Sequence, residues 1–298
     1  MKKILFLFFA LFLFSCSSAP KRLMQVSEVS DVSYSHLDQA NKSISEENYA
    51  RACTQLSKAY KLALSVDNTE LLCKVALSSL DFKIACPMIN EIIIASGMES
   101  SSSFLFDSNE EILSFAKKLA ARSSEPALYS SLCSVYEVRV LMDEEKSKNG
   151  GQISSKSLQK YAVMLEAAKK NISKEPYYLA CLHRTLGDVF LSGKDFELSY
   201  KNFETAAEIH TKNRYLVDIG LDWYCAARSL SLWGKKSEAV KALEKALYYD
   251  KAAENNRGIA SDYLAYSKIL LKGEPTESEM LLSAELSLWS KKILEAGE

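Results

Sequence analysis

The strongest constraint on this chain is a spacing of small and bulky side chains that recurs with a period of about 34–40 residues. It is clearest in residues 180–213, where the positions are His183, Leu186, Gly187, Phe190, Ser199, Phe203 and Ala206. A second copy in residues 220–253 has Trp223, Ala226, Ala227, Leu230, Ala239, Leu243 and Ala246. A third copy in residues 33–66 has His36, Ala40, Ser43, Tyr49, Ala52, Leu56 and Ala59.

Intervals of three and four residues mark one face of an α-helix, so each copy predicts a pair of antiparallel helices. We expect Gly187 and Ala227, on the first helix of their pairs, to let the second helix approach closely. A single pair cannot bury its apolar face, so successive pairs must stack. The alternative is an arbitrary helical bundle with small residues at these positions by chance, which the agreement of three copies in spacing disfavours.

The spacing resembles that of the tetratricopeptide-repeat family over roughly half of the chain. The resemblance implies an all-α fold, a TPR-like α-solenoid of stacked antiparallel helix pairs with about thirteen helices. The small numbers of Gly (10) and Pro (5) agree with helices joined by short loops. Residues 67–175 look helical without a clean repeat, and a degenerate last pair covers residues 254–296.

Several polar residues and prolines predict where helices begin. We expect helix starts at Ser45-Glu46-Glu47, at Asp107-Ser108-Asn109-Glu110, at Ser154-Ser155 and beside Pro126, Pro176 and Pro275. Asn149-Gly150-Gly151 predicts a break between two long helices. Residues 97–107 predict an irregular loop, and its apolar triplet 104–106 is expected to tuck into the fold rather than to remain exposed.

The N-terminus has the pattern of an export signal. Lys2 and Lys3 precede an apolar run over residues 4–14, which is too short to span a bilayer stably. The run ends in Leu-Phe-Ser-Cys at Cys16, which resembles the lipobox of bacterial lipoproteins. The resemblance implies a lipoprotein signal peptide in residues 1–15, lipidation of Cys16, a flexible tether in residues 16–31 and the solenoid in residues 32–298. An ordinary signal peptide ending at a chance cysteine is the alternative.

The sequence proposes no catalytic chemistry. The three histidines have no metal-ligand spacing, and the repeat itself explains His36 and His183 as packing residues. No nucleotide-binding or nucleophile motif occurs, since Gly234-Lys235-Lys236-Ser237 lacks the first glycine of a P-loop. A formal net charge of −1 gives no reason to expect nucleic acid. We therefore expect no enzyme, cofactor or metal site.

Six cysteines remain beside Cys16, and we expect them to be small buried thiols. Their even number in an exported chain permits disulfides. If a bridge forms, the pairs Cys73–Cys86 and Cys53–Cys73 are the candidates.

The TPR resemblance implies that a partner binds the concave surface, which is lined by the first helix of each pair. The residues that flank the packing positions there are Arg184, Asp188, Tyr224, Arg228, Asp262 and Tyr266. Arginine and tyrosine in such a set could hold a peptide or a carboxylate. Solvated helix sides are the plain alternative.

These expectations lead to two main hypotheses on function, with an enzyme, recognisable by a deep pocket that holds ionisable groups of strongly shifted pKa, as a third alternative. The first is a lipid-anchored scaffold that binds a protein or peptide partner in the bacterial cell envelope, on the periplasmic or outer-membrane face. The second follows from a resemblance to the TPR lipoproteins associated with TRAP transporters, and is an accessory component that pairs with a solute-binding protein.

Overall fold

The computed structural model describes residues 28–86 and 107–297. The signal peptide, Cys16, most of the tether and the apolar triplet 104–106 lie outside the described residues, so their predicted roles stay predictions. None of the described helices is long and apolar enough to cross a membrane.

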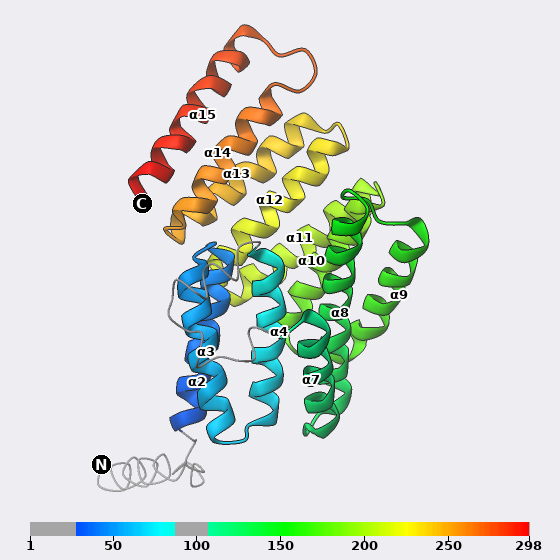
Figure 1. Cartoon of the computed structure of the whole chain (residues 1–298). Helices are drawn as coiled ribbons and strands as arrows, with labels where there is room; N and C mark the ends of the chain where they lie inside the picture. The colour runs from blue at the N-terminus through cyan, green and yellow to red at the C-terminus, as the bar shows by residue number, and fades with distance from the viewer. Residues whose placement is uncertain (1–27, 87–106, 298) are drawn as a thin grey trace, which may run out of the picture.

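The described residues form twelve α-helices and no strand, which confirms the all-α fold and comes close to the expected number of helices. They are α2 (Glu28–Ser45), α3 (Tyr49–Ser65), α4 (Thr69–Ala85), α7 (Asn109–Arg122), α8 (Pro126–Lys148), α9 (Ser155–Ile172), α10 (Pro176–Ser192), α11 (Phe196–Asn213), α12 (Leu216–Leu232), α13 (Lys236–Ala252), α14 (Asn256–Leu270) and α15 (Glu277–Gly297). Neighbours in this order pack against each other as antiparallel helices (Figure 1).

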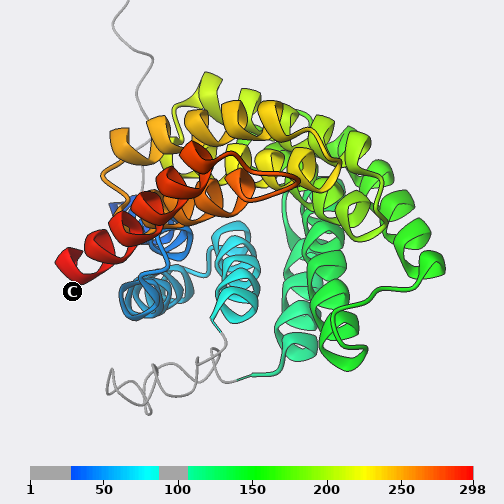
Figure 2. The same ribbon diagram turned by 90° about the horizontal axis from the view of Figure 1, so that it is seen from above.

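The stack of helices is curved (Figure 2). Helices α8 to α14 follow an arc, and α2 to α4 lie on its inner side. As a result α2, near the start of the described chain, contacts α12, which lies far from it in the sequence. This return of α2 onto a later repeat encloses the inner surface of the solenoid.

Two of the repeat copies share an equivalent contact between their helices as well as the same residue spacing. In the α2–α3 pair, His36 Nδ1 lies 2.6 Å from Gln55 Oε1. In the α10–α11 pair, His183 Nδ1 lies 2.9 Å from Asn202 Oδ1. Both histidines therefore bridge the two helices of a pair from equivalent positions, as the reading of them as packing residues requires.

Close approach of the two helices depends on Gly187. A Cβ atom there would lie 2.7 Å from the ring of Phe203 on α11, nearer than atoms can pack. The Ser199 hydroxyl also donates to the Gly187 carbonyl oxygen across the same gap, at 2.9 Å. Ala227 is fully buried in the next pair, at 1% exposure. The predicted role of small side chains in nesting the helices is confirmed.

Six of the turns between helices have the same geometry. In each turn a residue with positive φ comes directly before the N-cap residue of the next helix. The backbone amide of that N-cap residue donates to the carbonyl oxygen of the residue five positions earlier. The positive-φ residues are Glu47, Asp67, Lys194, Arg214, Gly234 and Glu254. This shared turn gives successive helices the same relative direction.

Most predicted helix starts are confirmed. Ser108 forms a capping box with Glu111, Ser154 caps α9, and Pro126 and Pro176 open α8 and α10. The start at Ser45-Glu46-Glu47 was placed too early: Ser45 ends α2, Glu47 takes the positive-φ position of the turn, and Asn48 caps α3.

The six cysteines of the described residues are free thiols, as expected, and neither candidate disulfide forms. The Cys73 thiol on α4 instead donates to the Ala116 carbonyl oxygen on α7 at 3.6 Å. Five of the six cysteines are buried, as expected of small apolar packing residues, and Cys225 is partly buried.

Candidate binding site on the inner surface

A cavity of about 690 Å³ lies where α2 meets the later repeats. Its walls come from α2, from Lys74 on α4, from the first turns of α10 and α12, and from the turn between α13 and α14. The lining residues are Tyr34, Leu37, Asp38, Asn41, Lys42, Lys74, Glu175, Tyr177, Tyr178, Arg214, Tyr215, Leu216, Val217, Asp218, Ala252, Ala253 and Glu254. Only the return of α2 brings these segments together.

Lys74 forms one wall of this cavity among tyrosine rings. Its Nζ lies 5.5 Å from the ring centre of Tyr34, 6.0 Å from that of Tyr129 and 5.6 Å from that of Tyr178. Attraction to the ring faces stabilises the ammonium group there. Among the described residues Lys74 has no ion pair and no hydrogen bond, so its donors remain available to a ligand.

The charges that line the cavity have both signs. Burial raises the pKa of Asp38, and the nearby charge of Lys74 opposes this rise. Asp38, Glu175 and Glu254 on the acidic side and Lys74 and Arg214 on the basic side have no salt bridge within the described part of the chain. The cavity therefore offers aromatic faces together with charges that a bound segment could neutralise.

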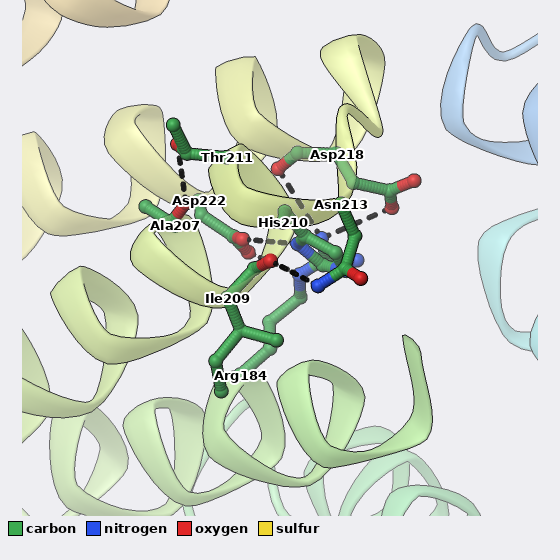
Figure 3. Close-up of polar contacts among 8 residues, drawn as sticks. All are labelled: Arg184, Ala207, Ile209, His210, Thr211, Asn213, Asp218 and Asp222. Carbon is green, nitrogen blue, oxygen red and sulfur yellow. Dashed lines mark hydrogen bonds and ion pairs between the residues drawn. The ribbon is translucent and has the colours of Figure 1, made fainter. Parts of the chain in front are cut away.

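Behind the opposite wall lies a buried network of charged residues (Figure 3). Arg184 Nε on α10 donates to Asp222 Oδ1 on α12 at 2.6 Å, and its Nη2 donates to Asp218 Oδ1 at 3.1 Å. On the other side of Asp222, Oδ2 lies 2.6 Å from Nδ1 of His210 on α11. Burial alone would lower the pKa of Arg184, but Asp222 and Asp218 hold it well above its ordinary value. The network ties three consecutive helices together.

The network also reaches the cavity. The imidazole of His210 packs edge-on against Tyr215, with ring centres 5.6 Å apart, and at a tilt against Tyr177, with ring centres 6.1 Å apart. Tyr177, Tyr215 and Asp218 all line the cavity. Because Asp222 and His210 are fully buried, they fix the position of this wall without touching its contents.

Three of the predicted groove residues, Arg184, Asp188 and Arg228, lie close enough for their charges to interact. Burial raises the pKa of Asp188, and the positive charges of Lys146 and Arg139, followed by those of Arg184 and Arg228, counteract the rise. Arg228 is exposed, whereas the side chain of Arg184 is only 11% exposed and already has two carboxylate partners. Arg184 therefore holds Asp218 against the cavity instead of presenting a free guanidinium group.

Two more predicted residues, Tyr224 and Asp262, line a separate cavity of about 130 Å³ between α12 and α14. The Asp262 carboxyl group lies against that of Asp250, and both are buried. Burial raises the pKa of Asp250 to about 6, and burial together with the charge of Asp250 raises the pKa of Asp262 to about 9, so Asp262 keeps its proton at neutral pH.

The sixth predicted residue, Tyr266, is only loosely engaged. Its hydroxyl donates to Glu244 Oε1 at 3.4 Å. It lines neither cavity. The structure thus separates the predicted set: Arg184 belongs to a buried network, Tyr224 and Asp262 line a small cavity, and Arg228 is exposed.

The lining of the larger cavity was not predicted from the sequence. The TPR resemblance predicts contacts at the middle of the first helix of each pair, whereas the cavity is lined by the first turns of α10 and α12. One signal was present: Tyr177-Tyr178 directly follows Pro176, and Tyr215 directly precedes α12, so aromatic residues open two successive repeats.

The described residues contain no group of three or more His, Cys, Asp or Glu side chains that could hold a metal ion. No protein-family model matches this chain, and no curated protein matches it.

Proposed function

We propose that this chain is a lipid-anchored, TPR-like scaffold of the bacterial cell envelope that binds a protein or peptide partner on its inner surface. The observation that carries the proposal is the cavity enclosed between α2 and the first turns of α10 and α12. Its tyrosines provide rigid faces for apolar side chains, which is the usual character of recognition surfaces.

The charge pattern favours a peptide over other ligands. A polyanion would meet Asp38, Glu175 and Glu254, and a polycation would meet Lys74 and Arg214. A peptide segment with an acidic side chain beside Lys74 and an apolar side chain between Tyr34 and Tyr215 could satisfy both. Tethering through Cys16 would keep the scaffold at the membrane, because two or more acyl chains anchor a protein stably.

The proposal is tested in cells with the full-length chain carrying a photoreactive amino acid in place of Tyr215. Tyr215 is 40% exposed in the cavity wall, so a bound partner should form one dominant covalent adduct. Val163 on α9, which is 64% exposed and outside the cavity, is the matched control position. A second substitution, Lys74→Glu, should reduce the Tyr215 adduct severalfold while leaving the far-ultraviolet circular dichroism unchanged.

Equal adducts from Tyr215 and Val163 would contradict the cavity as the binding site. The anchor is tested separately by Cys16→Ala, which should move the protein from the membrane fraction to the soluble fraction. Retention of this variant in the membrane would contradict lipidation.

A second candidate is an accessory role in TRAP-type transport, in which the chain pairs with a solute-binding protein. The cavity volume favours it, because about 690 Å³ lies within the range typical of small-molecule sites. Mass spectrometry of the Tyr215 adduct separates the candidates, since the second requires a solute-binding protein in it.

A further inference from the structure

Helix α15 has its polarity reversed. Surface helices normally bury apolar residues and expose polar ones. The buried residues of α15 are Ser283 and Ser290, which donate to the carbonyl oxygens of Ser267 at 3.0 Å and Ala260 at 2.7 Å on α14. Between them, Ser287 donates to the Ser267 hydroxyl at 3.0 Å. Small hydroxyl side chains therefore hold α15 against α14.

The opposite face of α15 is apolar and exposed. Leu281 is 63% exposed, Leu288 56% and Trp289 52%, and Leu282 lies beside them at 40%. Residues seven apart lie on the same side of a helix, so Leu281 with Leu288 and Leu282 with Trp289 form two adjacent apolar rows that make up one stripe along two turns. Exposed apolar stripes of this kind mark interaction sites in soluble domains. The exposed stripe on α15 therefore indicates a surface that binds a partner.

Two opposite charges lie within the stripe. Glu285 and Lys292 are also seven residues apart, and neither has an ion pair among the described residues. The Lys292 ammonium lies 5.8 Å from the Trp289 ring centre. The fixed spacing of one negative and one positive charge favours a protein partner that supplies opposite charges at matching positions.

The stripe is complementary to itself. Consider two copies of α15 placed antiparallel, with a two-fold axis passing level with the midpoint between Leu288 and Trp289. Leu288 then comes level with Trp289 of the second copy, and Glu285 comes level with Lys292 of the second copy. Both ion pairs form at once because a two-fold interface repeats each contact. The apolar residues between them are covered in the same step.

From this arrangement we infer that α15 is the interface of an antiparallel homodimer, with Leu288 and Trp289 at its centre. The inner cavity is formed by other elements, so dimerisation leaves it accessible and gives the assembly two copies of it.

The test uses the full-length chain in isolated membranes with Leu288→Cys and a short bis-maleimide cross-linker. Across the two-fold axis the two introduced thiols lie close together, so a cross-linked dimer should dominate. Val163→Cys, at a comparably exposed position on α9, is the control and should give at least tenfold less dimer. The unsubstituted chain controls for its own cysteines.

Charge reversal then tests the register in the Leu288→Cys background. Glu285→Lys or Lys292→Glu alone places like charges opposite each other and should lower the yield of dimer at least fivefold. The two changes together should restore it. Within one helix these residues are too far apart to pair, so restoration can come only from contact between copies.

A monomer in all variants would overturn the inference, and this includes the case in which α15 lies on lipid. Dimers that survive both single reversals would overturn the antiparallel register. Sedimentation velocity of the same variants in mild detergent gives an independent reading of the mass.

Discussion

Replacement of Arg184 by methionine should destabilise the fold strongly. Methionine keeps an apolar side chain of similar length but removes the cation between two carboxylates. Asp222 is fully buried, and the Asp218 side chain is 12% exposed, so water cannot replace the lost partner. Removing one member of a buried ion pair typically costs about 3–5 kcal/mol. We expect a loss of about 3 kcal/mol, because Asp222 keeps its contact with His210.

Lys201→Met is the matched control for this prediction. The Lys201–Glu197 pair has the same 2.6 Å separation as Arg184–Asp222, but its side chains are 58% and 53% exposed. Exposed pairs of this kind contribute little to the free energy of unfolding, and salt screens them. The two substitutions therefore differ mainly in the burial of the pair that they break.

The measurement is urea unfolding of both variants, followed by far-ultraviolet circular dichroism at low and at high salt. A second change, Asp222→Asn, should cost less in the Arg184→Met background than in the original chain, because the buried charge would already lack its cation. If Arg184→Met lowers the free energy of unfolding no more than Lys201→Met does, the network does not hold α10, α11 and α12 together as argued.

Two further changes test the packing and the buried acid pair. Gly187→Ala should lower the free energy of unfolding by about 1–3 kcal/mol because the new Cβ collides with Phe203, and Phe203→Leu should recover part of the loss. Gly193→Ala is the control and should be neutral, because its new Cβ would make only ordinary contacts. Equal losses from both glycine changes would contradict the close approach of α10 and α11. Burial raises the pKa of Asp262 from 3.8 to about 9, so the folded chain keeps a proton that the unfolded chain releases, and stability falls as pH rises through this window. Asp262→Asn should therefore raise the melting temperature at about pH 8 and have little effect at about pH 4. A gain in melting temperature that does not depend on pH would contradict the raised pKa of Asp262.

The sequence determined the fold class because the repeat consists of residues at fixed short intervals along the chain. Gly187, Ala227 and the histidines at equivalent positions mark which face of each helix meets its neighbour, and that information lies within one helix pair. Helix starts at Ser108, Ser154 and Pro176 were readable for the same reason, since a cap involves residues only three apart. The start of α3 was misplaced because Glu46 and Glu47 resemble a first turn while the positive φ at Glu47 ends the preceding one.

The binding site could not be read in this way because it depends on how the pairs curve. Small changes of angle between successive pairs add up along the stack, and their sum brings Tyr34 of α2 and Tyr215 into the lining of one cavity. The packing of α12 against its neighbouring pair decided that Arg184 meets Asp218 and Asp222 and is not left free for a partner. Spacing fixes which residues share a helix face, whereas the identity of the residue that lies across the gap from each of them is set by the tertiary structure.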